Sequence, residues 1–294
     1  MSIFNLFKNK KEIVMINETL KQQFLNMVKN EIVIKEKNSK SSKPNTSRIG
    51  GKPYLPKDFI WPTYTSYEDQ IKRHLSFLCQ INLEEIKDYD VDNVLPKTGL
   101  LYFFYDCDSM CFGLDPRDKE SAKIYYYDDT YDFALLDIPN DISDEYIIPE
   151  INIKFHSKKS YPEQEEFETL NDIKVDIEEY ENVLKKLGIN IDDEYEHKLL
   201  GYANTVQGEM LTEAERISRN LYSGDPESYQ NTPEEVQNEI KEHVNDWILL
   251  FQLTSIEKED FEFIVGDCGI IYFFIKKEDL KNKDFTNVHC AVQF

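Results

Sequence analysis

The sequence has no apolar run long enough to cross a membrane, because polar or charged residues interrupt every window of the roughly 20 residues that a bilayer span needs. The stretch from Met1 to Phe7 is mostly apolar, and Lys8, Lys10 and Lys11 follow it, which is the reverse of the order in a signal peptide. Five cysteines, an odd number, favour reduced thiols over a disulfide framework. We therefore expect a cytoplasmic protein without stable membrane insertion.

Basic residues are scarce, since 34 Lys and Arg stand against 56 Asp and Glu, for a formal net charge of −22. The charge is also uneven. Residues 1–57 carry 12 basic and 4 acidic side chains, which leaves −30 on the remainder. Solubility alone explains such a charge, but an acidic body also attracts basic partners and repels nucleic acid. The composition thus predicts a basic protein or a small molecule as partner and argues against nucleic acid.

Signature motifs of common enzymes and metal sites are absent as well. The sequence has no P-loop, no Gly-x-Gly-x-x-Gly and no Gly-x-Ser-x-Gly. Cys107 and Cys111 lack the second cysteine pair of a zinc site, and we interpret them as core thiols. The acidic run from Asp128 to Asp132 lacks the glycine and the distal glutamate of a calcium loop. We therefore expect no metal, no cofactor and no assigned catalytic residue.

The sequence does contain one apolar pattern that occurs twice. Residues 77–81 read Phe-Leu-Cys-Gln-Ile and residues 249–253 read Leu-Leu-Phe-Gln-Leu, and each run precedes a Gly, two aliphatic residues, Tyr and two Phe, at 99–104 and 269–274. Apolar runs of this length, bounded by turn residues, predict buried strands. The sequence therefore predicts an α+β fold of duplicated, mostly antiparallel β-sheet units with a pseudo-twofold relation, flanked by amphipathic helices.

The same pattern sets the expected domain organisation. Residues 1–42 form a basic arm and a helix, and residues 43–294 form a single domain with pseudo-repeats at about 43–156 and 197–294. An acidic, helical segment at 157–246 overlaps the second repeat. No Gly/Ser-rich or Pro-rich linker separates the repeats, so we expect one unit.

Local signals place several elements within that domain. Asp176 and Gly188 predict the two ends of one helix, and Thr232 with Glu235 predicts a capping box that opens another. Residues 261–265 and 269–275, around a Gly-Asp-Cys-Gly turn, predict a hairpin.

Several motifs together resemble a known family. The motifs are Gly50-Gly51-Lys52-Pro53-Tyr54-Leu55-Pro56 with Trp61-Pro62, the two glutamine-containing runs, and Leu199-Leu200-Gly201-Tyr202 with Val206-Gln207-Gly208. From about residue 43 to 294 the chain resembles the YwqG-like family of bacterial proteins, a family of domains of unknown function. The resemblance implies an α+β fold with β-rich halves. It implies no established catalytic residue, cofactor or substrate.

Candidate ligand-binding residues come from the repeated runs and the loops beside them. A buried glutamine must satisfy both ends of its amide. Each of the two glutamines therefore either pins a neighbouring loop or lines the floor of a cleft between the halves. The candidates are Gly50, Gly51, Trp61, Gln80, His197, Tyr202, Gln207 and Gln252.

Two functions stay open. The first, which we favour, is a non-catalytic binding protein with a cleft between two β-rich halves, lined by loops 50–61 and 201–207, that captures a basic partner as an inhibitor or immunity protein does. The second is a small-molecule hydrolase that uses His197 for proton transfer, with its pKa raised by the carboxylates of Asp192, Asp193, Glu194 and Glu196.

Overall fold

Strands dominate the computed structural model, which describes residues 18–38, 43–189 and 195–294. Ten of them form one sheet, and every strand pairing described is antiparallel. In spatial order they are β16 (Val288–Gln293), β15 (Ile270–Lys276), β12 (Trp247–Thr254), β11 (His197–Leu200), β1 (Lys29–Glu36), β10 (Ile151–Ser160), β2 (Arg48–Ile49), β6 (Ser76–Asn82), β7 (Leu100–Tyr105) and β8 (Ala122–Tyr127). The four apolar runs are β6, β7, β12 and β15, which confirms a mixed fold with a large antiparallel sheet.

The strand order divides the sheet into two comparable halves. Strands β2, β6, β7 and β8 form the first half, and strands β11, β12, β15 and β16 form the second. Between them lie β1 and β10, which pair with each other and join the halves. Each of these two long strands also pairs with the innermost strand of one half, β1 with β11 and β10 with β2.

The sheet curls into a nearly closed barrel, because its edge strands β8 and β16 approach each other. The loop after β7 covers this seam, where the amide of Val292 donates to the carbonyl of Phe112 at 3.2 Å. Gly113, with φ of +81°, passes so close to β16 that a Cβ atom would overlap the carbonyl oxygen of Cys290. Only glycine therefore fits the seam at this position.

Alternate side chains of the strands fill the barrel. In β7, Leu101, Phe103 and Tyr105 belong to the interior cluster, whereas the residues between them belong to a cluster on the outer face. The ring of Phe103 contacts two rings of the second half, with centroids 4.4 Å from Phe251 and 5.2 Å from Phe273. Side chains therefore pack the space between the two halves.

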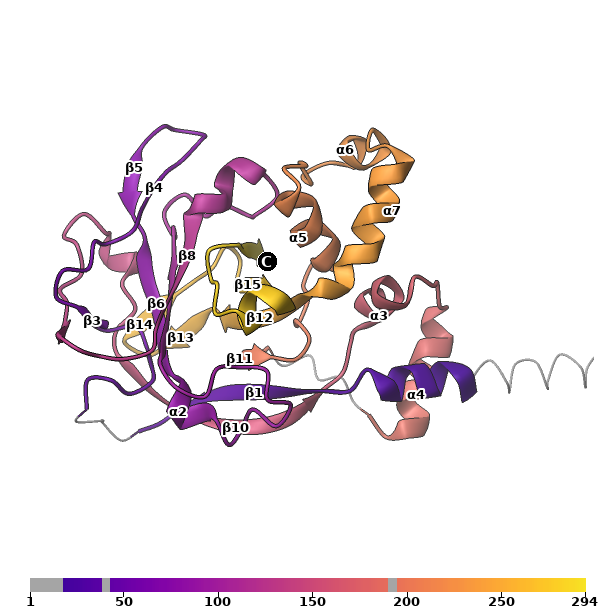
Figure 1. Cartoon of the computed structure of the whole chain (residues 1–294), viewed down its shortest axis with the longest axis horizontal. Helices are drawn as coiled ribbons and strands as arrows, with labels where there is room; N and C mark the ends of the chain where they lie inside the picture. The colour runs from indigo at the N-terminus through magenta and orange to yellow at the C-terminus, as the bar shows by residue number, and fades with distance from the viewer. Residues whose placement is uncertain (1–17, 39–42, 190–194) are drawn as a thin grey trace, which may run out of the picture.

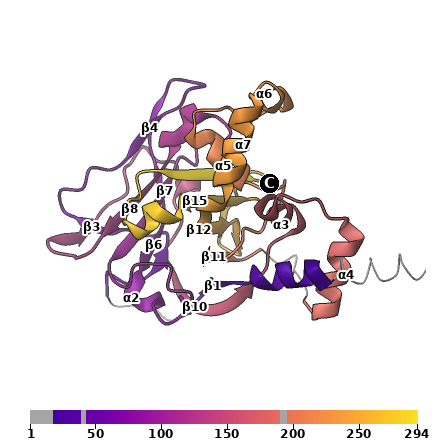
Figure 2. The same ribbon diagram turned by 45° about the vertical axis from the view of Figure 1, so that its right-hand side comes forward.

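Helices cover the outer face of the second half (Figures 1 and 2). Helices α5 (Leu211–Ser218) and α7 (Glu234–His243) pack over β12 and β15, and the short α6 (Pro226–Gln230) and the 3₁₀ helix η3 (Val244–Asp246) lie on either side of α7 in the chain. The helical residues 18–26 pack against α3 (Gln164–Asn171) and α4 (Ile177–Leu187) in an adjoining cluster. Within the described ranges no helix is both long enough and apolar enough to cross a membrane.

Loops and short strand pairs cover the outer face of the first half. The pairs are β3 (Tyr54–Pro56) with β9 (Phe133–Leu135) and β4 (Thr63–Thr65) with β5 (Lys72–His74). A third pair, β13 (Ile256–Lys258) with β14 (Phe261–Phe263), lies between β12 and β15 in the chain. The remaining short elements are α2 (Leu83–Ile86), α8 (Lys277–Lys281) and the 3₁₀ helices η1 (Pro116–Ser121) and η2 (Asp144–Tyr146).

The structure confirms one local prediction about helix ends. Helix α4 begins after Asp176, whose side chain accepts from the amide of Glu178 at 2.9 Å, and it ends at Gly188, with φ of +65°. The basic arm at residues 1–17 lies outside the described residues.

Two other local predictions are wrong. The hydroxyl of Thr232 does not cap α7, because it donates to the carbonyl of Ser228 and accepts from the guanidinium of Arg216. Strand β14 does not form a hairpin with β15, because β12 and β16 already occupy both edges of β15. Strand β14 pairs with β13 instead.

Candidate functional site

Gln80 lies on the outer face of the barrel, where it pairs in register with Tyr102. Its Oε1 atom accepts from the amide of Tyr54 at 2.9 Å, and its Nε2 atom donates to the carbonyls of Pro44 and Thr46 at 3.1 and 2.9 Å. The phenol of Tyr102 donates to the carbonyl of Tyr54. The glutamine and the tyrosine thus hold both backbone groups of Tyr54, the first residue of β3.

Gln252 makes the corresponding contacts in the second half. Its Oε1 atom accepts from the amide of Asn204 at 2.9 Å, and its Nε2 atom donates to the Oδ1 of Asn204 and to the carbonyl of Glu196, both at 2.9 Å. Tyr272, its partner in register, donates to the carbonyl of Asn204 at 2.6 Å. Each glutamine strand also has a register shift two residues before the glutamine, at residues 77–79 and 249–251.

Three further candidates lie with Gln80 in the first half. Gly50 and Gly51 adopt φ of +63° and +70° where the chain leaves β2, and the amide of Gly50 donates to the carbonyl of Leu78 at 2.8 Å. The indole of Trp61 donates to the carbonyl of Leu75 at 2.8 Å and packs on the outer cluster. These residues shape the cover of the first half.

The remaining candidates, apart from Gln207, lie near the middle of the sheet. The phenol of Tyr202 donates to the carbonyl of Met27 at 2.5 Å, and the ammonium of Lys29 lies 3.8 Å from the centroid of the Tyr202 ring. His197, in β11, directly follows Glu196, whose carbonyl accepts from Gln252. The structure therefore divides the eight candidates between the two halves, and loops 50–61 and 201–207 pack on different outer clusters.

His197 does not have the raised pKa that its acidic neighbourhood predicts. Burial lowers its pKa to about 4, and the charges of Lys35 and Lys258 lower it further, against a smaller opposite effect of Glu196. The Nδ1 atom of His197 lies 3.1 Å from the amide nitrogen and 2.9 Å from the hydroxyl oxygen of Thr254. The other expected carboxylates, Asp192, Asp193 and Glu194, lie outside the described residues.

Gln207 lies at a polar cavity of about 460 Å³, which we call the acidic pocket. Helices α3, α5 and α6 surround it, together with the turn before α5. Four carboxylate side chains line the pocket, those of Glu165, Glu168, Glu209 and Glu213, and the ring of Tyr229 lines it too.

The pocket carboxylates differ in their partners. Glu168 pairs with Lys174 at 2.6 Å. Glu209 accepts from the amide and the hydroxyl of Thr212 at 2.9 and 2.8 Å, and Glu165 accepts from the amide of Glu209 at 3.3 Å. Within the part of the chain that is described, Glu165, Glu209 and Glu213 form no ion pair. Three carboxyl groups therefore share the pocket without a cation of their own, because Lys174, which also lines it, pairs with Glu168.

Burial raises the pKa of two of these carboxyl groups. The pKa of Glu213 rises to about 7, because burial disfavours the charged form and the charge of Glu209 adds to that effect. The pKa of Glu209 rises too, because its burial outweighs its hydrogen bonds with Thr212. In Glu168, burial acts in the same direction, but the hydrogen bonds from Lys174, Val175 and Gln164 outweigh it and lower the pKa.

The C-terminal strand holds the turn that closes the pocket. The Oε1 atom of Gln293 accepts from the amides of Val206 and Gln207 at 2.9 and 3.0 Å, and its Nε2 atom donates to the carbonyl of Gly208 at 3.0 Å. Gly208 has φ of +123°, and a Cβ atom there would lie 2.9 Å from an oxygen of Glu165. Glycine thus lets the backbone run directly beside a pocket carboxylate.

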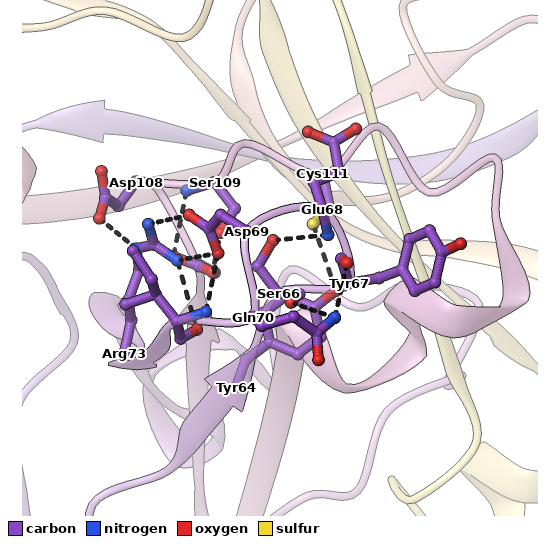
Figure 3. Close-up of polar contacts among 12 residues, drawn as sticks. Tyr64, Ser66, Tyr67, Glu68, Asp69, Gln70, Arg73, Asp108, Ser109 and Cys111 are labelled. Carbon is purple, nitrogen blue, oxygen red and sulfur yellow. Dashed lines mark hydrogen bonds and ion pairs between the residues drawn. The ribbon is translucent and has the colours of Figure 1, made fainter.

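A second polar cluster lies around Arg73, Asp108 and Cys111 (Figure 3). Arg73, in β5, bridges Asp69 and Asp108, so a cation already pairs with the aspartate beside Cys107. The thiol of Cys111 lies 3.8 Å from the phenol of Tyr64. Among the described residues there is no group of three or more His, Cys, Asp or Glu side chains arranged to hold a metal ion.

Sequence reasoning placed only Gln207 at the acidic pocket. The signal that it left unused is the acidic composition of residues 157–200, because helix α3 takes two pocket carboxylates from that stretch. Glu209 and Glu213 carried no sequence signal of their own. Their contribution depends on how the start of α5 and the turn before it dock beside α3.

Comparison with known proteins gives one family match. A family model described as a domain of unknown function (DUF1963) matches residues 47–293. The YwqG-like name suggested by the motifs stays a prediction. A search of curated proteins found no match.

Proposed function

The chain belongs to the DUF1963 family of domains of unknown function, and we propose that it is a non-catalytic binding protein that captures a basic partner through the acidic pocket. The observation that carries the proposal is the convergence of four carboxylate side chains on one cavity of about 460 Å³. The sequence suggested a cleft between the halves, but side chains pack that space. We therefore place the binding site on the outer surface.

The charge of the pocket calls for a cation from outside. Lys174 also lines the pocket, but it pairs with Glu168 and its side chain is 91% exposed, so the other three carboxyl groups still lack an ion pair among the described residues. A lysine or arginine side chain in the pocket would meet Glu165, Glu209 and Glu213 at once. Charge-assisted hydrogen bonds of this kind are about twice as strong as neutral ones. A cationic side chain therefore fits the pocket better than a neutral or anionic one.

The acidic surface supports the same choice of partner. With a net charge of −22, the whole molecule attracts cationic proteins over long range and repels anionic ones. We favour the carboxylates over Tyr229 as the recognition groups, because the guanidinium of Arg216 already lies 3.9 Å from the centroid of that ring. The captured group is a single basic side chain, and the acidic surface around it speeds the encounter.

Isothermal titration with an Arg-Gly repeat peptide at low and high salt tests the proposal. We expect binding that weakens as salt rises, and a loss of at least about tenfold in affinity in Glu213→Gln. Glu234→Gln is the matched control, because Glu234 is an exposed glutamate in the first turn of α7, away from the pocket. Equal losses of affinity in both variants would show that net charge, and not the pocket, determines binding, which would contradict the proposal. Absence of binding at low salt would also refute it.

We also infer that the two halves descend from one duplicated unit. The matched contacts of Gln80 and Gln252 support this inference, as does a strand order in which each half runs from one central strand to an edge. The copies then begin earlier than the sequence suggested, with β1 as the first strand of one and β10 as the first strand of the other. Each of these two strands pairs with the innermost strand of the opposite half, β1 with β11 and β10 with β2. Superposing the two sets of strands tests the inference, and it fails if no single rotation brings the glutamines and their tyrosine partners together.

The hydrolase alternative stays a prediction of the sequence. No observation at His197 favours it, because Thr254 occupies the Nδ1 atom and burial keeps the imidazole neutral at pH 7.

A further inference from the structure

A second cavity, of about 260 Å³, lies at the end of the barrel near the seam between its halves. Lys119, from η1, comes from the first half, and the other lining residues come from α5, β12, β15, α8 and β16 with the turn before it in the second half. The apolar wall consists of Ala214, Ile217, Trp247 and Val288. We call this cavity the seam pocket.

His289, which lines the seam pocket, has an unsatisfied nitrogen. Its side chain faces outward from β16 between the rings of Phe274 and Trp247, with centroids 6.3 and 6.5 Å away, and the residue is only 4% exposed. The Nε2 atom is buried and has no hydrogen-bond partner. Burial lowers the pKa of His289 to about 4, so the ring is neutral at pH 7. Buried polar atoms without a partner are rare in native proteins, and each needs an explanation.

The charged groups around the cavity are not all matched. Lys276 is neutralised, because its ammonium lies 2.8 Å from an oxygen of Glu215. Lys119 contacts only the side-chain oxygen of Asn287, at 3.4 Å, and forms no ion pair with any residue that the structure describes. Asp279 also lines the cavity, and burial and the charge of Asp284 raise its pKa. The cavity is thus lined by one exposed lysine without an ion pair among the described residues, beside a neutral imidazole.

We propose that the seam pocket binds a small monocarboxylate with an apolar body. The carboxylate would lie at Lys119 and the amide of Asn287, and the apolar body would lie against Trp247, Ile217 and Val288. A monoanion fits better than a phosphate dianion, because Glu215 and Asp279 would repel the second charge. The imidazole of His289, which also lines the pocket, would lie beside the ligand. This site is separate from the acidic pocket and takes a ligand of opposite charge.

Tryptophan fluorescence can report on this site alone. The chain has two tryptophans, Trp61 and Trp247, so Trp61→Phe leaves the seam pocket with the sole reporter. The probe is benzoate, and benzamide and benzylamine are its neutral and cationic counterparts. We expect benzoate to change the fluorescence of Trp247 with saturation and to shift the imidazole resonances of His289, and we expect neither counterpart to do so at the same concentration.

Lys119→Gln tests the recognition of the charge without disturbing the core. We expect it to weaken benzoate binding at least about tenfold. Lys123→Gln is the matched control, because Lys123 is a neighbouring lysine that pairs with Glu120 and does not line the cavity. Absence of saturable benzoate binding would overturn the proposal. So would equal affinity in Lys119→Gln and the parent, or tighter binding of benzylamine than of benzoate.

Discussion

Replacement of the two matched glutamines by methionine measures what their contacts contribute to stability. Gln80→Met and Gln252→Met keep the length of each fully buried side chain and remove its three hydrogen bonds. At about 1 kcal/mol for each bond, we expect a loss of about 3 kcal/mol in the free energy of unfolding for each variant. Because both glutamines accept from one backbone amide and donate to two acceptors in the same way, the two losses should agree within about 1 kcal/mol.

Urea unfolding followed by circular dichroism gives these free energies. Gln22→Met is the control, because Gln22 makes one exposed hydrogen bond to Asn26, and we expect a change within about 0.5 kcal/mol. A loss below about 1 kcal/mol in either core variant would refute the view that these side chains hold the loops. A large loss in one variant and none in the other would contradict the equivalence of the two halves.

Three further predictions concern the seam and two buried ionisable groups. Gly113→Ala should lower the unfolding free energy by at least about 2 kcal/mol more than Gly188→Ala does. Both glycines have positive φ, but only at Gly113 would a Cβ atom overlap a neighbouring strand. Equal losses in urea unfolding would contradict this prediction. His197 protonates near pH 6.5 when unfolded but near 4 when folded, so its stabilising contribution is present above pH 6.5 and is lost as pH falls towards 4. Between pH 7 and 5 the free energy of unfolding should fall by about 2 kcal/mol because of His197, and His197→Gln should remove that part of the pH dependence. The same dependence of unfolding free energy on pH in the variant and the parent would disprove the prediction. Burial raises the pKa of Glu166 to about 8 from 4.5, so the free energy of unfolding falls as pH rises through that interval. The difference in unfolding free energy between Glu166→Gln and the parent should therefore be more favourable to the variant at pH 8 than at pH 5. A difference that is less favourable to the variant at pH 8 would contradict the burial argument.

The core of the fold could be predicted because it depends on local pattern. The runs around Gln80 and Gln252 are apolar on both faces, and strands of that kind are buried whichever strands they pair with. The end of α4 at Gly188 was equally local, because only a residue that tolerates positive φ suits that position. The prediction of a hairpin between β14 and β15 failed because β12 and β16, which precede and follow this segment, occupy both edges of β15, so β14 pairs with β13 instead.

The candidate sites, unlike these strands, depend on residues that are far apart in the chain. The acidic pocket forms only when residues 207–213 dock beside α3, and the seam pocket needs Lys119 beside a strand about 170 residues further along the chain. No spacing in the sequence encodes either approach. The charge of the partner could be predicted from the sequence, because 56 acidic residues against 34 basic ones indicate a cationic partner.

Proton release on binding tests the central claim most directly. If a basic side chain enters the acidic pocket, it lowers the pKa of Glu213 from its free value of about 7. Titration of the Arg-Gly peptide at pH 7 in two buffers of different ionisation enthalpy counts the protons released. We predict release of up to about half a proton by the parent protein and markedly less by Glu213→Gln. Equal release by the two proteins, or binding without any proton release, would contradict the account.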